Sequence, residues 1–208
     1  MFSNKSLSEF QRVGRALLEL GLVGSHSGNM SLRHGQSLYI TRHGAMLGFL
    51  EKKDIVKTGM ARGSPGSERA SREVNVHRAI LTDLRKNGAR SVIHAHPIYA
   101  IALSLVSDEI VPVDVEGSFY LPRIPVLSFT RASASQEMED ALPRALRKSR
   151  AVMVRGHGSF AVGRTLEEAL QLTSVLESNA EIMYRVMALG GDIEKLTKRR
   201  YLKWPTRK

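Results

Sequence analysis

The feature that most constrains the fold is a long amphipathic segment whose two ends are both marked in the sequence. Thr165-Leu166-Glu167-Glu168 has the form of a capping box, and Gly190-Gly191 is a natural helix stop. Between them, apolar residues recur at helical spacing, which predicts a helix of about 24 residues, roughly 36 Å long. Its apolar stripe indicates a face buried in the core or at a subunit interface: Leu166, Leu170, Leu176, Ala180, Met183 and Met187.

The rest of the chain mixes helical and extended patterns without strict alternation. Further helices are predicted after a capping box at Ser6–Glu9, over about 71–86, from Pro97 onward, and over Gln136–Lys148, where Pro143 should kink or interrupt the helix. Short strands are predicted at Met30–Leu32, Ser37–Thr41, Ser91–His96, Val111–Val115, Ile124–Leu127, Ala151–Arg155 and Ser159–Val162. This mixture favours an α/β (α+β) fold, with one domain over residues 1–191, a mixed or antiparallel sheet, and a basic tail at 192–208.

Length and composition fit a single globular domain. The chain has 208 residues and is 42% hydrophobic, which allows a sizeable core. It has no cysteine, so any metal ligand must be histidine, aspartate or glutamate. The segment Met1–Lys5 lacks the form of a signal peptide, and no run approaches the roughly 18 apolar residues of a membrane span. We therefore expect a soluble, cytoplasmic protein.

The chain is strongly basic, with 31 Lys and Arg against 20 Asp and Glu and a formal charge of +11. The basic residues are scattered, with local runs at Arg144–Arg150 and Lys198–Lys208, and no zinc finger or RNA-recognition signature accompanies them. The charge therefore indicates a solvated basic surface or a small anionic substrate rather than nucleic acid. A filter-binding assay without retention at physiological salt would dismiss nucleic acid.

Three histidines form a candidate metal site. His94 and His96 are two apart on a predicted strand, so both side chains point to the same face. His157 lies between two glycines, which leave room for close backbone approach. Three imidazoles leave a fourth zinc position open, as in catalytic zinc sites. Each motif alone is weak evidence for a metal site. Glu73 lies at the start of a predicted helix, where a carboxylate is also common simply because the helix dipole stabilises it.

Six short motifs follow one another along the chain: Ser27-Gly28-Asn29-Met30-Ser31, Thr41 to Gly44, Ser71-Arg72-Glu73, His94-Ala95-His96-Pro97, Gly156-His157-Gly158 and Gly163-Arg164-Thr165-Leu166-Glu167-Glu168-Ala169. With these motifs in this order, the chain resembles the class II aldolase/adducin family, and most closely its L-fuculose-1-phosphate aldolase branch. The resemblance covers roughly residues 7–191.

The resemblance implies a fold, a site and a reaction. It implies a single domain with a central, mainly antiparallel sheet, commonly in a homotetramer with the active site at a subunit boundary. His94, His96 and His157 match the family's zinc ligands, and Glu73 matches its catalytic acid/base. Positions that hold the substrate phosphate are matched by Gly28, Asn29, Gly44 and Ser71. The implied reaction is reversible cleavage of a ketose 1-phosphate to dihydroxyacetone phosphate and an aldehyde, through a metal-stabilised enediolate.

Three residues depart from the family pattern. His43 and Arg72 stand where the phosphate-binding stretch usually has hydroxyl residues, and Arg72 suits either a phosphate or a carboxylate. Glu116 falls near the position of a tyrosine that reaches a neighbouring subunit's site to protonate the alkoxide, and Tyr120 is close but out of register. These differences leave a second hypothesis open, another zinc lyase such as a decarboxylase of a hydroxylated acid or a dehydratase. A third, a non-catalytic adducin-like module, is disfavoured because all three ligands are present.

Overall fold

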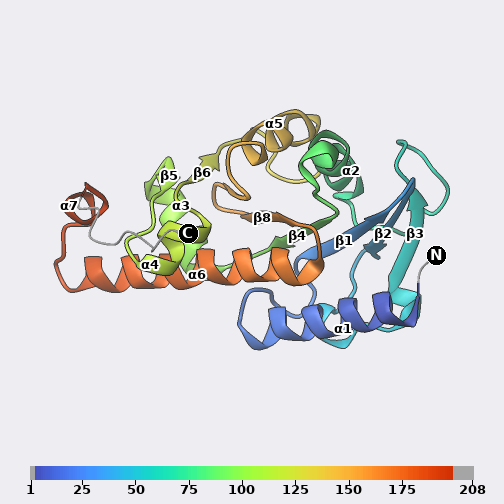
Figure 1. The fold of residues 1–208 in the computed structure, drawn as a ribbon, viewed down its shortest axis with the longest axis horizontal. Coiled ribbons are helices and arrows are strands. Elements are labelled where there is room, and N and C mark those ends of the chain that lie inside the picture. Colours follow the sequence, from blue (N-terminus) through green and yellow to red (C-terminus); the bar gives the residue numbers. More distant parts are fainter. Residues whose placement is uncertain (1–2, 199–208) are drawn as a thin grey trace, which may run out of the picture.

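The computed structural model describes residues 3–198, which form eight strands and seven α-helices (Figure 1). The strands are β1 Asn29–His34, β2 Ser37–Thr41, β3 Ile55–Gly59, β4 Ser91–Ala95, β5 Glu109–Ile110, β6 Ile124–Leu127, β7 Ala151–Val154 and β8 Gly158–Gly163. The helices are α1 Asn4–Glu19, α2 Val74–Asp83, α3 Ile98–Val106, α4 Val115–Tyr120, α5 Gln136–Leu146, α6 Leu166–Ala188 and α7 Ile193–Lys198. Short 3₁₀ turns are η1 Leu47–Phe49, η2 Lys52–Asp54 and η3 Leu84–Asn87.

The eight strands form one sheet in the order β3-β2-β1-β4-β8-β7-β6-β5. Every neighbouring pair is antiparallel except β6 and β7, which are parallel. The expected single domain with a central, mainly antiparallel sheet is therefore confirmed. β4 lies between β1 and β8, where His94 pairs with Asn29 on one side and with Phe160 on the other. The strand with the His-x-His motif thus runs through the middle of the sheet.

Helices cover both faces of this sheet (Figure 1). α2 and α5 pack on one face, in a core cluster that includes Val92 and Phe160 of the sheet. α1 and α6 lie on the opposite face, in clusters that include Ile93 and Ala161. Because side chains alternate along a strand, His94 shares the α2 side with Val92. The pattern of β4 therefore directs His94 towards the start of α2.

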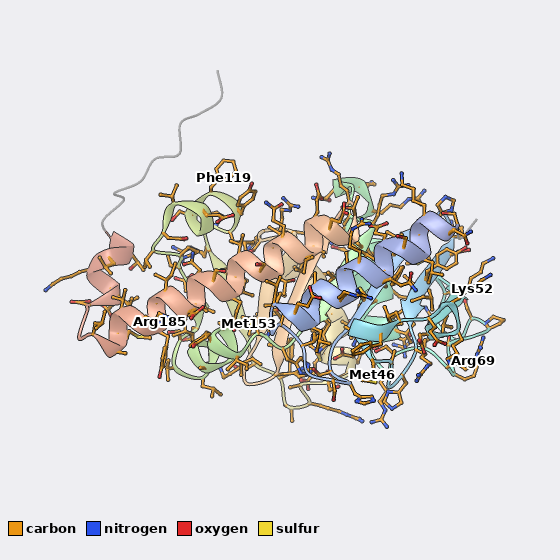
Figure 2. All side chains as sticks on the ribbon, turned by 90° about the horizontal axis from the view of Figure 1, so that it is seen from below. Met46, Lys52, Arg69, Phe119, Met153 and Arg185 are labelled. Atoms are coloured by element: carbon orange, nitrogen blue, oxygen red, sulfur yellow. The ribbon has the colours of Figure 1, made fainter. Side chains whose placement is uncertain are left out.

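The long C-terminal helix is confirmed, whereas the start of the first helix differs from the expectation. α6 spans 23 residues, and its cap Thr165 accepts a hydrogen bond from Glu168 N, as predicted. The capping box expected at Ser6–Glu9 is wrong, because Ser3 caps α1 instead. The Glu9 carboxylate accepts from Leu166 N at 2.9 Å and so caps the neighbouring helix. α1 and α6 lie on the same face of the sheet, where the N-terminal end of α6 meets α1 (Figure 2).

Two further expectations need correction, and one strand was not predicted. The extended segment predicted at Val111–Val115 is wrong, since β5 ends at Ile110 and α4 begins at Val115, where Asp114 accepts from Gly117 N. The α5 helix is not interrupted at Pro143, which lies within it and is buried in the core. No sequence pattern predicts β3, which pairs with β2 at the edge of the sheet.

Gly14 marks a close approach between α1 and η1, and Gly14→Ala should destabilise the protein. A Cβ at this position would lie 2.1 Å from the Leu47 carbonyl oxygen. Alanine ordinarily stabilises a helix interior by about 1 kcal/mol over glycine, but overpacking costs about 1–3 kcal/mol. The clash is with backbone, so we expect the cost to lie at the upper end and the free energy of unfolding, measured with denaturant, to fall by up to about 2 kcal/mol. Ser8→Ala, on the exposed side of the same helix, is the control and should change stability by less than about 0.5 kcal/mol.

The expected boundary between the domain and a tail at residue 192 stays a prediction. α7 begins at Ile193, and this residue packs against the core cluster between α3, α6 and the strands β6, β7 and β8. Residues 199–208, which hold most of the predicted basic tail, lie outside the described residues. Within residues 3–198, no helix is both long and apolar enough to cross a membrane.

Candidate metal centre

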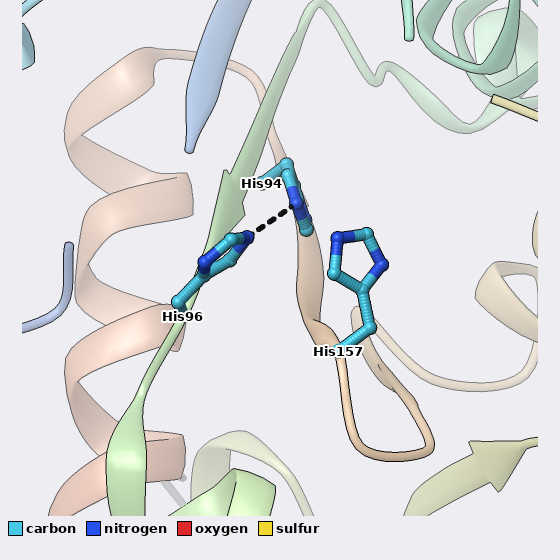
Figure 3. Close-up of side chains that lie close together, drawn as sticks. All are labelled: His94, His96 and His157. Carbon is cyan, nitrogen blue, oxygen red and sulfur yellow. Dashed lines mark hydrogen bonds between the residues drawn. The ribbon is translucent and has the colours of Figure 1, made fainter. Parts of the chain in front are cut away.

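His94, His96 and His157 converge at one end of the central strands (Figure 3). His94 is the fourth residue of β4, and His96 follows the strand directly. His157 lies in the short turn between β7 and β8. The ring centroids are 4.7 to 5.2 Å apart, and one ligand nitrogen from each ring lies within 4.8 Å of the others. The structure therefore brings the three histidine side chains together, as the sequence predicts.

Burial and one hydrogen bond define the protonation state of His94. Its Nδ1 donates to the Ser159 carbonyl oxygen at 2.9 Å, because a carbonyl only accepts. Burial, together with the nearby His157, lowers the pKa of His94 to about 3, so the ring is neutral at physiological pH. A neutral ring with a proton on Nδ1 presents a lone pair at Nε2. This is the form in which histidine binds a metal ion.

His96 faces the same point. Its Nε2 lies 2.9 Å from His94 Nε2. Burial, followed by the neighbouring His94 and His157, lowers the pKa of His96 to about 4. Both rings are therefore neutral at physiological pH and direct nitrogen atoms toward a common position.

Glu73 adds a carboxylate beside these nitrogens. It is the N-cap residue of α2 and is only 4% exposed. Its Oε2 accepts a hydrogen bond from Asn29 Nδ2 at 2.9 Å and lies 3.4 Å from His94 Nε2. Its other oxygen, Oε1, is buried without a hydrogen-bond partner. The carboxylate is thus held in place through one oxygen while the second remains available.

The residues present fit a divalent cation. His94 Nε2 and Glu73 Oε2 are both lone-pair atoms, and their approach to 3.4 Å in a buried site is unfavourable unless a cation or proton lies between them. All five buried side-chain atoms without a hydrogen-bond partner belong to this region of the described chain: Asn29 Oδ1, Glu73 Oε1, His77 Nε2, His157 Nδ1 and Ser159 Oγ. Imidazole nitrogens and a carboxylate oxygen suit a borderline-soft ion such as zinc.

Gly158 provides the space that these rings occupy. A Cβ there would lie 2.8 Å from His96 Cδ2 and 3.0 Å from His94 Cε1. Since real Cβ atoms essentially never approach so closely, a side chain at this position would displace both ligands. The glycine after His157 is therefore explained by the packing of the other two histidines.

Four candidate anion-binding residues come from two segments that lie side by side: His43, Gly44, Ser71 and Arg72. Two backbone hydrogen bonds join the segments: Ser71 N donates to Thr41 O at 3.0 Å, and His43 N donates to Arg69 O at 3.1 Å. Ser71 is buried, whereas His43, Gly44 and Arg72 are exposed. The arrangement presents two cationic or ionisable side chains to solvent close to Glu73.

The two remaining candidates, Gly28 and Asn29, lie directly beside the histidines. A Cβ on Gly28 would lie 2.8 Å from the His94 carbonyl oxygen, and the residue has a positive φ of 76°. Asn29 contacts Glu73 rather than presenting its amide to solvent, and it is only 7% exposed. Its position therefore indicates a role in holding the Glu73 carboxylate, while phosphate binding by these residues stays a prediction.

Glu116 is not brought to the histidines within this chain. It is exposed in the first turn of α4, which packs on α6. Tyr120, at the end of the same helix, packs against the core cluster between α3, α6 and the strands β6, β7 and β8. No hydrogen bond or ion pair joins Glu116 to the three histidines in the described part of the chain. A catalytic role for Glu116 stays a prediction, and it would require a neighbouring subunit.

His77 is a neighbour of the site that the sequence analysis does not single out. It is fully buried, its Nδ1 lies 2.7 Å from Ser31 Oγ, and its ring meets Phe160 edge-on. Phe160 in turn stacks on His94 at 4.4 Å. His77 follows Glu73 by four residues on one helix, which puts the two on the same side and is a signal that the sequence carries.

The buried His77 predicts how stability depends on pH. Burial lowers its pKa to about 3, from 6.5 for an unperturbed histidine. The unfolded chain therefore binds more protons between these values, and the free energy of unfolding should fall as the pH drops from 6.5 towards 3, by up to about 1.4 kcal/mol per unit. Urea unfolding of chelator-treated protein near pH 7 and pH 5 measures the loss. His77→Gln should show a smaller loss, and an equal one would contradict the assignment.

Comparisons with known proteins agree with the fold and the motifs. A protein named L-fuculose phosphate aldolase from Methanococcus maripaludis is 29% identical over 182 residues, which cover 86% of this chain and 96% of the relative. The crystal structure of L-fuculose-1-phosphate aldolase from Thermus thermophilus has a TM-score of 0.81 at 36% identity, covering 89% of this chain and 96% of that one. A 3-oxo-tetronate 4-phosphate decarboxylase from Haemophilus influenzae is 26% identical over 194 residues, which cover 89% of each.

The family itself follows from the match along the chain. The model of the family described as Class II Aldolase and Adducin N-terminal domain matches residues 8–184, which include all three histidines and Glu73. The resemblance built on six short motifs is therefore confirmed, and the similar proteins named above are lyases. By its sequence and its fold, this chain belongs to the class II aldolase and adducin N-terminal domain family.

Proposed function

We propose that the protein is a metal-dependent aldolase that reversibly cleaves a ketose 1-phosphate, similar to fuculose 1-phosphate, into dihydroxyacetone phosphate and an aldehyde. The observation that carries the proposal is the buried Glu73 carboxylate 3.4 Å from Nε2 of a histidine that belongs to a three-histidine cluster. The aldolase relatives at 29% and 36% identity support the same reaction class.

The three histidines would hold one divalent cation per subunit, which we propose to be zinc. Such a cation supplies Lewis-acid polarisation of the substrate carbonyl. His94 and His96 contribute neutral imidazoles, because their low pKa values keep protons from competing with the cation for the ring nitrogens. Asn29 holds one Glu73 oxygen, which leaves the other free to exchange a proton with substrate.

The reaction assigns distinct proton transfers to the chain's own residues. When the C3–C4 bond of the ketose breaks, C3 gains a proton and the C4 hydroxyl loses one. We assign delivery of the C3 proton to Glu73, which removes it again in the aldol direction. The C4 hydroxyl needs a second group, and Glu116 of a neighbouring subunit is the candidate, because it is exposed and is not part of the histidine cluster of its own chain.

We further propose that the substrate phosphate lies over the turn that holds His43 and Gly44 and the segment of Ser71 and Arg72. The buried Ser71 hydroxyl and the exposed Arg72 guanidinium would be its main partners. A guanidinium group can donate two parallel hydrogen bonds to two oxygens of one phosphate. The role given to Glu116 implies a homo-oligomer, which we propose to be a tetramer in the cytoplasm. Light scattering on purified protein tests the tetramer.

A panel of ketose 1-phosphates tests the reaction. Protein loaded with zinc is incubated with fuculose 1-phosphate, ribulose 1-phosphate and related esters, and dihydroxyacetone phosphate is measured by a coupled reductase. Release from at least one ester, lost after chelation and restored by metal, is the expected result. Absence of release across the panel would sink the proposal.

A second candidate is decarboxylation of a hydroxylated acid. The relative named 3-oxo-tetronate 4-phosphate decarboxylase and the exposed Arg72, which suits a carboxylate as well as a phosphate, favour it. Carbon dioxide release from a panel of phosphorylated keto acids, without release of dihydroxyacetone phosphate from the ketose panel, would replace the first candidate by this one.

A further inference from the structure

We propose that Arg155 is a positioning residue for His157: it pins the turn between β7 and β8 to the C-terminal end of α3. The inference rests on the proposed metal centre but not on the proposed substrate. It concerns how one ligand is held relative to the other two, and it assigns a role to a side chain outside the motifs of the sequence analysis.

His157 is the ligand that most needs such support. His94 is oriented by its hydrogen bond to the Ser159 carbonyl. The Nδ1 atom of His157 is instead buried without a partner, so no hydrogen bond of that atom fixes its ring. Its placement depends on the turn itself, in which His157 N donates to Val154 O at 3.0 Å and Gly156 has a φ of 67°. Whatever orients this turn also orients the ligand.

Arg155 ties the turn to two other segments through its side chain. Its Nε donates to Ser128 Oγ, just beyond β6, at 2.8 Å. Its Nη1 donates to the carbonyl oxygens of Ser104 and Ser107 at the end of α3, and its Nη2 pairs with Asp108. These bonds use the rigid fork of the guanidinium, which a lysine could not reproduce. A side chain that is only 26% exposed thus joins α3, β6 and the turn.

A second tie lies beside the first. Gly156 N donates to Ser104 Oγ at 3.0 Å, and the same hydroxyl donates its proton to Ile101 O at 2.6 Å. Because Ser104 is fully buried and its proton is committed, its oxygen faces the turn as an acceptor. Two consecutive residues of the turn, Arg155 and Gly156, are therefore bound to one residue of α3.

The other end of α3 is anchored next to His96. The helix begins after His96 and Pro97, and the Glu177 carboxylate accepts from Tyr99 N and Ala100 N, each at 3.0 Å. α3 is thus held at its start beside one ligand and at its end beside another. It acts as a spacer between His96 and His157, and Arg155 is the principal link at the second end.

Metal affinity tests the role of Arg155. Arg155→Met keeps a long side chain and removes the guanidinium, and Arg150→Met, at the opposite end of β7, removes an arginine whose partner is Glu168. Zinc affinity is measured by competition with a chromophoric chelator, and ligand geometry by the visible spectrum of the cobalt form. We expect about 10–100-fold weaker binding and an altered cobalt spectrum for Arg155→Met, with Arg150→Met unchanged within about twofold.

Ser104→Ala separates positioning from folding. It removes only the hydroxyl that accepts from Gly156, and it should weaken zinc binding several-fold in the same direction. Thermal unfolding of the metal-free variants shows whether each is folded at the assay temperature, and if Arg155→Met is not, the result for Ser104→Ala decides. Unchanged affinity and cobalt spectrum in the folded variants would overturn the role of Arg155. Normal metal binding without release of dihydroxyacetone phosphate would overturn only the proposed substrate, and a parent protein that binds no divalent metal would overturn both.

Discussion

Replacing Glu73 with glutamine is expected to lower kcat by about 10²–10⁴-fold while metal binding is retained. The amide keeps the shape of the side chain and an oxygen that accepts from Asn29, so the local packing should survive. It cannot take up or release a proton at neutral pH, so a proton transfer assigned to Glu73 would stop. Steady-state kinetics on the best ketose 1-phosphate of the panel, with zinc content measured on the same sample, give both quantities.

Glu68→Gln is the matched control for this experiment. Glu68 lies five residues earlier on the same approach to α2, is exposed, and faces only Arg69 at 3.9 Å. Its replacement should leave kcat unchanged. A fully active Glu73→Gln protein would show that another group carries the proton, and loss of zinc from Glu73→Gln would assign the carboxylate to the metal rather than to acid/base chemistry.

Replacing His157 with alanine is expected to remove metal and activity together. Changes in residues that only support a ligand already weaken metal binding by about 10–100-fold, so loss of a ligand should exceed about 100-fold. The two remaining histidines, His94 and His96, would leave the cation with too few protein ligands for a stable site. Zinc content after dialysis, the zinc dissociation constant and the rate of substrate cleavage should all report the loss.

His34→Ala is the control, because His34 is the exposed last residue of β1, where the strand pairs with β2. It should retain parental zinc content and turnover. Retention of stoichiometric zinc by His157→Ala would remove that residue from the ligand set. Absence of a divalent metal from the parent protein would revive the adducin-like alternative, in which the fold serves an interaction rather than a reaction.

Much of the fold could be predicted from the sequence, namely those elements whose signals lie within one continuous segment. The long helix α6 was predictable because Thr165 caps it and its apolar residues recur at helical spacing, and both are properties of adjacent residues. The hairpin of β1 and β2 and the strand β4 follow for the same reason. Prediction from local sequence failed where a residue's hydrogen-bond partner lies far away along the chain.

Glu9 and Asp114 illustrate this limit. Glu9 has the spacing of a capping box within its own helix, but its carboxylate caps α6, which begins 157 residues later in the chain. Asp114 caps α4, and Asn179 of α6 holds both Asp114 and the backbone N–H of Val113. Long-range hydrogen bonds of this kind outweigh the weak preferences of short segments, and they carry no signature in the local sequence.

By itself the sequence determined the family, the residue types of the candidate metal centre, and the shared face of His94 and His96, because these depend on motif order and on the period of a strand. Only the tertiary structure decided that Asn29 holds Glu73, that His77 lies beneath the site, and that Glu116 stands apart from the triad of its own chain. It also decided that Arg155 clamps the turn of His157. Those relations depend on the packing of segments distant in sequence, which no local pattern specifies.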